Sequence, residues 1–297
     1  MSHVSVLLHE AIDGLALAKG QVYFDGTLGG AGHAESVAKQ FGNDIKIIAT
    51  DLDTDTILAG TKVLERYSKN FTLVKANFRD VKRVLSEAKV SQVDAILLDL
   101  GLRSDQLDSS GRGFSFRYDE PLLMTFTKNP EDNTVTAYDV VNTWSEETLA
   151  DIMYGYSDER YARRIAKAIV EAREDYAIMT TGQLVAIIEG AVPGSYRHGK
   201  THPATKTFQA IRMAVNDEVN ALKEGLADGI EVLAPKGRMA VISFHSVEDR
   251  IVKDFFRERV KEGVGKLINK KPIIPTEAEV KANPRSRSAK LRIFAKN

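Results

Sequence analysis

The sequence predicts an α/β fold in which a largely parallel sheet is interrupted by a helical insertion. Within the first hundred residues, short β-branched apolar runs alternate with amphipathic helical patterns, an order typical of βαβ units. Strand-like runs disappear between residues 105 and about 203 and return after a long helical pattern at Thr205–Leu226. These observations divide the chain into a core of residues 1–104 and 205–297 and an insertion of residues 105–204.

Hydrophobic periodicity and turn residues place the individual elements. Short apolar runs predict the strands Val22–Asp25, Ile45–Asp51, Phe71–Lys75, Val93–Asp99, Arg238–Phe244 and Ala289–Ala295. Helical periodicity predicts core helices at Ala34–Gln40, Thr54–Tyr67, Val81–Glu87 and Val247–Val260, and insertion helices at Glu146–Tyr154, Asp158–Arg173 and Thr180–Glu189. Ligands of parallel sheets bind beyond the carboxyl ends of the strands, so we expect the chemistry there.

Composition excludes several classes of protein. The chain has 297 residues, 43% of them hydrophobic, enough to bury a sizeable core. No apolar stretch approaches the roughly 20 residues of a membrane span, and the N-terminus lacks the features of a signal peptide, so we expect a cytoplasmic protein with no membrane partner. The absence of cysteine excludes disulfides and thiolate zinc sites, and the six histidines lack ligand spacing. The sequence therefore predicts no metal site.

Basic residues gather toward the C-terminus. The formal net charge is zero, so total charge does not favour a polyanionic partner. Residues 250–297, however, hold 14 Lys or Arg and 5 Asp or Glu. This region is either a solvated tail or a basic face that binds RNA phosphates, and charge alone leaves both interpretations open.

A glycine-rich turn follows the first predicted strand. Residues 25–33, Asp-Gly-Thr-Leu-Gly-Gly-Ala-Gly-His, allow a tight turn and close backbone approach to a ligand, although a plain strand-to-helix connection has the same pattern. Asp51, at the end of the second strand, is placed to accept both hydroxyls of a ribose. NAD needs a regular GxGxxG to seat its pyrophosphate, which this turn lacks. The pattern therefore favours S-adenosylmethionine.

Two further strand ends carry candidate residues. Phe78, after the third strand, offers an aromatic face for adenine, although a lone phenylalanine is also an ordinary core residue. Asp99, at the end of the fourth strand, can face the cofactor or a substrate amino group, or can cap a helix.

Many ordered blocks of the chain match one bacterial family over nearly the full length. The blocks are His3–Leu7 with Glu10, Asp25–Thr27, Gly32–His33, Ile96–Gly101, Gln106–Asp108, Arg112–Phe116, Glu159–Arg160, Ala162–Ala166, His202–Thr205, Thr207–Ala210, Ile242–Ser246, Glu248–Lys253 and Asn283–Arg292. On these residues the chain resembles the bacterial cytosine-N4 methyltransferases of small-subunit ribosomal RNA, the methyltransferase H family.

The resemblance implies a class I, Rossmann-like S-adenosylmethionine methyltransferase sheet with an inserted all-helical domain that recognises the substrate. It implies small-subunit ribosomal RNA as the partner. Whether the substrate is free RNA or the assembled subunit, and whether the chain forms a homodimer, stays open. By resemblance, the cofactor contacts come from Ala31, Gly32, His33, Asp51, Phe78, Asp99 and Gln106.

Methylation of an exocyclic amine requires alignment of the reacting atoms and an acceptor for the amino hydrogen. Asp99 is the first candidate acceptor. The target base must leave its stack and rest on aromatic faces. Phe244 and His245 are candidates for this contact, with packing into the core as the alternative. Phe114 and Phe116 are further candidates, with anchoring of a loop as the alternative. Basic residues expected to contact phosphates are Arg163, Arg164, Lys167, Arg285, Arg287, Lys290 and Arg292.

The chain departs from the family pattern at Leu102–Asp105 and Asp119–Phe126. Arg103, Asp105, Glu120 and Leu123 leave open whether the substrate or the activity is altered. One alternative is an RNA-binding ribosome-assembly homologue without turnover, which cofactor binding without methyl transfer would favour. Another is a dinucleotide-dependent oxidoreductase, which absorbance changes with NAD(P)H would reveal.

Overall fold

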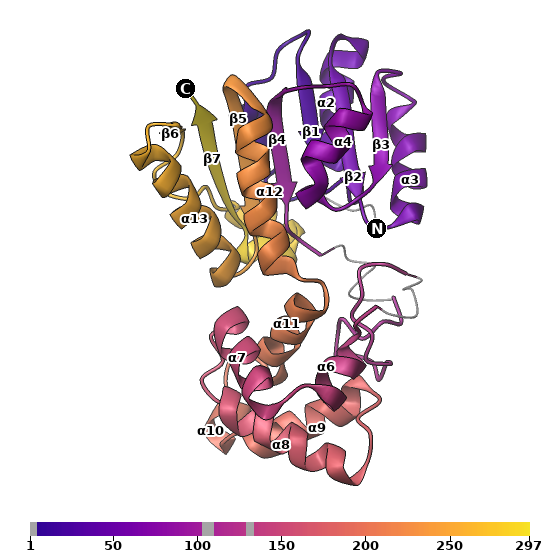
Figure 1. The fold of residues 1–297 in the computed structure, drawn as a ribbon, viewed down its shortest axis with the longest axis vertical. Coiled ribbons are helices and arrows are strands. Elements are labelled where there is room, and N and C mark those ends of the chain that lie inside the picture. The colour runs from indigo at the N-terminus through magenta and orange to yellow at the C-terminus, as the bar shows by residue number, and fades with distance from the viewer. Residues whose placement is uncertain (1–4, 103–109, 129–133) are drawn as a thin grey trace. The chain divides into compact units, whose positions relative to one another are not determined.

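The computed structural model describes residues 5–102, 110–128 and 134–297. Contacts group the chain into two compact units: unit 1 contains Met1–Arg103 and Asn220–Asn297, and unit 2 contains Ser104–Val219. Figure 1 shows the sheet in unit 1 and a set of helices in unit 2. In the part of the chain that the structure describes, no helix is long and apolar enough to cross a bilayer.

Unit 1 is built on a seven-stranded sheet in the order β3-β2-β1-β4-β5-β7-β6. The first five strands pair in parallel, whereas β7 runs antiparallel to β5 and β6. The predicted α/β fold is confirmed. The strands are β1 (Val22–Asp25), β2 (Lys46–Asp51), β3 (Phe71–Lys75), β4 (Val93–Asp99), β5 (Leu233–Ser243), β6 (Gly265–Leu267) and β7 (Lys290–Lys296).

Helices cover both faces of this sheet. Along β4, Ala95 and Leu97 enter one apolar cluster, and Ile96 and Leu98 enter the other. Because both faces are buried, the central strands are nearly continuous apolar runs. The first cluster includes buried residues of α1 (Leu8–Leu15), α2 (Gly32–Phe41) and α3 (Thr54–Leu64), and the second includes those of α4 (Val81–Glu87), α12 (Glu218–Val232) and α13 (Ser246–Lys261). The short elements are η1 (Gly42–Asp44), η2 (Phe78–Asp80), α14 (Glu277–Ala282) and η3 (Pro284–Ser288).

The named elements in the described part of unit 2 are all helices. Side chains of Thr136, Ser145 and Thr180 accept backbone hydrogen bonds at the N-termini of α6, α7 and α9, which satisfies donors that a helix leaves open. The helices are α6 (Ala137–Thr143), α7 (Glu146–Ser157), α8 (Ala162–Asp175), α9 (Thr181–Ala191), α10 (Gly194–Arg197) and α11 (Ala204–Val215).

The long helix expected at Thr205–Leu226 is wrong, because the chain breaks there into α11 and α12. Asp217 adopts a left-handed φ of 49°. The Asn216 side chain accepts a hydrogen bond from the Phe126 amide at 2.8 Å and donates to the Met124 carbonyl at 2.7 Å. This tertiary anchor explains the break. It also leaves α11 in unit 2, so the unit boundary falls after Val219 rather than after residue 204.

Candidate active site

Three aspartates end neighbouring parallel strands. Asp25, Asp51 and Asp99 close β1, β2 and β4. The register pairs Asp25 with Ala49 on β2 and with Leu97 on β4. Asp51 and Asp99 therefore each extend two residues beyond Asp25 at the same edge of the sheet. The structure thus brings together the carboxylates on which the sequence-based prediction of the site depends.

The glycine turn is fastened to Asp51. The Gly29 amide donates to Asp51 Oδ2 at 3.0 Å, and the Asp53 amide donates to Oδ1 at 2.9 Å. Gly29 and Ala31 both have left-handed φ values, 50° and 62°, and Ala31 precedes α2 without a side-chain cap. A carboxylate oxygen can accept more than one hydrogen bond, so this anchoring is compatible with Asp51 also accepting ribose hydroxyls.

Two glycines of the turn are required by close packing within the protein. A Cβ at Gly32 would collide with the hydroxyl of Ser5, and one at Gly26 would collide with the side chains of Leu98 and Phe78. The N-terminal segment thus lies directly against the start of α2. Sequence alone explains the glycines by approach of a ligand, whereas these two positions are also fixed by their protein neighbours.

His33 is buried between the N-terminal segment and Asp99. Its Nε2 lies 3.2 Å from the Val6 carbonyl oxygen, and its Nδ1 lies 3.9 Å from Asp99 Oδ2. Only 5% of the residue is exposed. The ring therefore links two parts of the site, and its contact with a cofactor stays a prediction.

Burial shifts the pKa values of two carboxyl groups in the site upward. Burial raises the pKa of Asp99 to about 7; the charges of Asp25 and Glu248 act in the same direction, and a hydrogen bond from the Gly101 amide opposes them. Burial also raises the pKa of Asp25 to about 6, although hydrogen bonds from Thr27 and Tyr23 oppose it. Strongly perturbed groups at one strand edge are typical of functional sites.

Phe244 and His245 follow β5, the strand beside β4. Asp99 pairs with Ile242 on β5, and the ring of Phe244 packs closely over Gly101. The Nδ1 of His245 accepts from the Glu248 amide at 3.4 Å, and its Nε2 lies 2.9 Å from Glu248 Oε1. The short Nε2–Oε1 distance lacks hydrogen-bond geometry within the described residues, and the role of His245 as a ring surface for the base stays a prediction.

The remaining predicted cofactor and base contacts have different surroundings. Phe78 is half-buried and packs closely on Gly225 of α12. In unit 2, Phe114 is 7% exposed and stacks on Phe126, and Phe116 stacks on His202. These rings have packing roles whatever else they contact. Gln106, Arg103 and Asp105 lie outside the described residues.

The predicted RNA contacts fall into two groups. On α8 of unit 2, Arg163, Arg164 and Lys167 are exposed, and Lys167 lies 3.6 Å from Glu171. In unit 1, η3 carries an exposed Arg287 and a half-buried Arg285. Both groups keep cations at the surface, and their RNA contacts stay a prediction.

Arg292 is a correction to the predicted RNA contacts, because its guanidinium is held inside unit 1. Nε and Nη2 donate to the two oxygens of Asp249 at 2.7 and 3.2 Å, and 11% of the side chain is exposed. Lys290 donates to the same carboxylate at 3.2 Å. A bidentate buried pair is a structural contact, so Arg292 is not presented to a phosphate.

Sequence reasoning assigned no individual role to Glu248 and Asp249, the adjacent acids in the first turn of α13. Their only local signal is that acidic residues favour a helix N-terminus. Arg112 was also missed as an anchor: its Nη1 donates to the carbonyls of Thr125 and Phe126, both at 2.8 Å. The partners of Asp249 and Arg112 lie elsewhere in the chain, so periodicity gives no sign of them, whereas Glu248 contacts Phe244 and His245 just before it.

The strand order, with antiparallel β7 between β5 and β6, defines the class I, Rossmann-like methyltransferase fold. The chain belongs to the MraW methylase family, whose model matches residues 1–297.

Curated relatives match along almost their entire length. The chain is 46% identical over 305 residues to the ribosomal RNA small subunit methyltransferase H of Syntrophus aciditrophicus (strain SB), covering 98% of this chain and 96% of the relative. It is 43% identical over 309 residues to the protein of the same name from Brevibacillus brevis (strain 47), covering 99% and 98%. A crystal structure of an rRNA methylase from Streptococcus thermophilus aligns over 99% of this chain and 98% of its own, at 9% identity and a TM-score of 0.46.

Proposed function

We propose that this chain transfers a methyl group from S-adenosylmethionine to the N4 amino group of a cytidine in small-subunit ribosomal RNA, in the cytoplasm. The observation that carries the proposal is one edge of the sheet, where the glycine turn is fastened to Asp51 at the end of β2 and Asp99 ends β4. Membership of a methylase family supports the reaction class. The names of the relatives support the substrate.

The residues at this edge fit a nucleoside cofactor. Asp51 is oriented by two backbone amides, so its carboxylate is fixed before any ribose binds. The turn brings the uncapped start of α2 to the same place, and Phe78 follows β3 next along the edge. The proposed cofactor contacts are Ala31, Gly32, His33, Asp51, Phe78 and Asp99, with Gln106 from outside the described residues.

The reaction requires the protein to align the target amine with the methyl group and to provide a proton acceptor. S-adenosylmethionine supplies an activated methyl group on a sulfonium. Positioning of the target amine can contribute roughly 7–11 kcal/mol. As the N–C bond forms and the C–S bond breaks, Asp99 accepts an N–H hydrogen bond from the amine and then takes its proton. A carboxyl group with a pKa of about 7 is matched to that task near neutral pH.

The cofactor part of the proposal is tested by Asp51→Ala. The substitution removes a charged acceptor of two hydroxyls, so we expect S-adenosylmethionine to bind more weakly by roughly 1.5–3 kcal/mol, measured by calorimetry. Asp44→Ala is a matched control, because Asp44 is a half-exposed carboxylate that pairs with Lys19 at 2.7 Å. Unchanged affinity in the Asp51 variant would remove Asp51 from the site.

The reaction is tested by mass spectrometry of ribosomal RNA nucleosides from cells with and without the gene. We expect N4-methylcytidine only where the gene is present. Purified chain should then methylate either free small-subunit RNA or the assembled subunit, and comparing the two substrates identifies the form that it uses. Cofactor binding without methyl transfer to either would instead indicate an RNA-binding assembly factor.

A further inference from the structure

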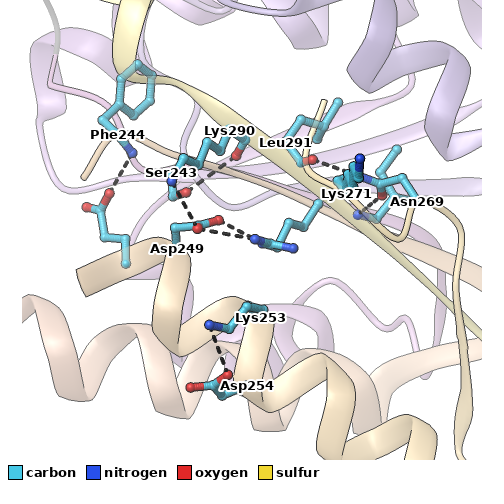
Figure 2. A network of polar contacts seen from close by, with 12 residues as sticks. Ser243, Phe244, Asp249, Lys253, Asp254, Asn269, Lys271, Lys290 and Leu291 are labelled. Atoms are coloured by element: carbon cyan, nitrogen blue, oxygen red, sulfur yellow. Dashed lines mark hydrogen bonds and ion pairs between the residues drawn. The ribbon is translucent and has the colours of Figure 1, made fainter. Parts of the chain in front are cut away.

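The first turn of α13 carries two adjacent acids that hold different parts of unit 1. Asp249 binds Arg292 and Lys290 on β7; Figure 2 labels Asp249 and Lys290 in this cluster. Glu248, one residue earlier, turns instead toward Phe244 and His245. The contacts of Asp249 join helix to sheet, whereas those of Glu248 reach the proposed active site.

Glu248 contacts the turn after β5 through both carboxylate oxygens and hydrogen-bonds it through one of them. Oε2 accepts a hydrogen bond from the Phe244 amide at 2.8 Å, drawn as a dashed line in Figure 2. Oε1 lies 2.9 Å from His245 Nε2. With 6% of its side chain exposed, the carboxylate is shielded from water, so these contacts decide where the turn lies.

These contacts differ from those of a helix cap. His245 is the N-cap of α13, and Glu248 stands at the third helical position, where a capping-box side chain bonds the N-cap amide. Glu248 bonds the amide of Phe244 instead, one residue before the cap. The ladder of β5 with β7 ends at Ser243, and the partly buried amide just beyond it needs a partner. Glu248 supplies that partner with a charged acceptor.

The turn that Glu248 holds lies beside the proposed proton acceptor. Asp99 pairs with Ile242 on β5, two residues before Phe244. The Phe244 ring in turn covers Gly101, two residues after Asp99. Glu248 therefore determines how the aromatic pair faces the end of β4. Its charge also reaches Asp99, where it reinforces the effect of burial on the pKa.

We propose that Glu248 is a positioning residue for methyl transfer, holding the Phe244–His245 turn in the geometry that the target base meets beside Asp99. The proposal rests on the proposed function. Glu248 touches neither substrate nor cofactor in it; the residue acts through the turn and through its charge on Asp99.

Two variants separate the effect of the length of the Glu248 side chain from the effect of its charge. Glu248→Gln keeps the size of the side chain but removes the charge and one acceptor oxygen. Glu248→Asp keeps the charge but shortens the reach. A matched control is Glu218→Gln, because Glu218 is a similarly shielded carboxylate, bonded to Arg212 in unit 2 at 2.7 and 2.8 Å. Each full-length variant is assayed below its melting transition with ribosomal RNA and S-adenosylmethionine.

We expect both Glu248 variants to lower kcat by about 10- to 100-fold, since displacement of a positioned group by about 1 Å costs up to about 100-fold. The Kd for S-adenosylmethionine should stay within about twofold, because the turn at Asp51 is untouched. If the substitution only weakened the helix cap, the protein would lose stability, but kcat would not fall while the Kd for S-adenosylmethionine stayed unchanged. Glu218→Gln should keep wild-type kcat.

The pH profile distinguishes the variants further. Among the residues that the structure describes, the titratable groups facing Asp99 are Asp25 and Tyr23 on β1, His33 on α2 and Glu248 on α13. Removing the negative charge of Glu248 lets the pKa of Asp99 fall. The acid limb of the kcat profile should therefore move to lower pH in Glu248→Gln and stay in place in Glu248→Asp.

Wild-type kcat and an unshifted pH profile in both Glu248 variants would overturn the proposal and leave Glu248 as a structural cap. If Glu248→Gln does not fold, Glu248→Asp and His245→Asn carry the test, because asparagine is a good N-cap but removes the ring contact. A wild-type chain that binds S-adenosylmethionine and transfers no methyl group overturns the proposed function, and the proposal for Glu248 with it. An active wild type with unaffected variants overturns the proposal for Glu248 alone.

Discussion

Buried carboxylates on the two sides of β5 have opposite electrostatic surroundings. Toward β4, Asp25 and Asp99 have no lysine or arginine partner within the described residues, and burial raises both pKa values. Toward β7, burial also acts to raise the pKa of Asp249, but hydrogen bonds and charges of Arg292 and Lys290 outweigh it and hold that pKa below its usual value.

The difference separates a carboxylate that serves the fold from one that serves a site. A buried charge costs several kcal/mol unless it is paired, and Asp249 is paired with good geometry. Among the described residues, Asp99 accepts a hydrogen bond from the Gly101 amide at 3.4 Å and lies 3.9 Å from the ring of His33, but no lysine or arginine pairs with it. The proposed function explains this cost, because a site that receives a cationic sulfonium and an amine has use for a carboxylate that no lysine or arginine of the described residues neutralises.

The largest expected effect comes from breaking the ion pair between Asp249 and Arg292. Asp249→Asn leaves the guanidinium of Arg292 buried without a counter-charge, so we expect the free energy of unfolding to fall by about 3–5 kcal/mol, measured by urea denaturation. The double variant Asp249→Leu with Arg292→Met should recover most of that loss, since well-packed apolar residues can replace a buried pair. A loss below about 1 kcal/mol in the single variant would show that the pair contributes little to stability. It would contradict the difference in role between Asp249 and Asp99.

The carboxyl groups of Asp25 and Asp99, which have no lysine or arginine partner within the described residues, should make the stability of the protein depend on pH. Asp25 and Asp99 have raised pKa values of about 6 and 7 in the folded chain, so their contribution is fully present below the unfolded value near 3.8 and is lost as pH rises through 6 and 7. We expect Asp99→Asn to reduce the stability difference between pH 5 and pH 8 by roughly 1–3 kcal/mol, since one pKa unit is about 1.4 kcal/mol and partial exposure reduces the full effect.

Urea denaturation across this pH range measures the effect, with Asp44→Asn as an exposed control that should leave the curve unchanged. The contribution of Asp249 has the opposite sign. Its stabilisation is present above the unfolded pKa and is lost as the pH falls below about 4. A wild-type stability curve that is flat between pH 5 and pH 8 would contradict the assignment of raised pKa values to Asp25 and Asp99.

Local patterns in the sequence predicted the strands well. β3 and β4 have the predicted bounds, because β-branched apolar runs are local signals. β5 begins earlier, at Leu233, since an irregular register between Val93 and Ala95 of β4 accommodates extra residues. The break between α11 and α12 escaped prediction because Asn216 bonds to Phe126, 90 positions away.

The same limit applies to the site. The positions of Asp51 and Asp99 at strand ends follow from periodicity and from the rule that parallel strands end at a common edge. The pairing of Asp249 with Arg292 spans 43 positions and leaves no periodic sign. Basic residues of the C-terminal segment therefore look alike in sequence, although the structure uses Arg292 internally and exposes Arg287.

The smallest expected effect concerns two cations at the surface of η3. We expect replacement of Arg285 and Arg287 by Gln to weaken RNA binding and to flatten its salt dependence by up to about 0.7–0.9 log units per lost phosphate contact. Binding isotherms with ribosomal RNA at several salt concentrations measure this slope, and calorimetry should show unchanged affinity for S-adenosylmethionine. Replacement of Arg163 and Arg164 by Gln gives the matching measurement for unit 2. If the η3 double variant keeps the wild-type slope while the α8 variant loses it, the C-terminal segment is a solvated surface and α8 carries the RNA contacts.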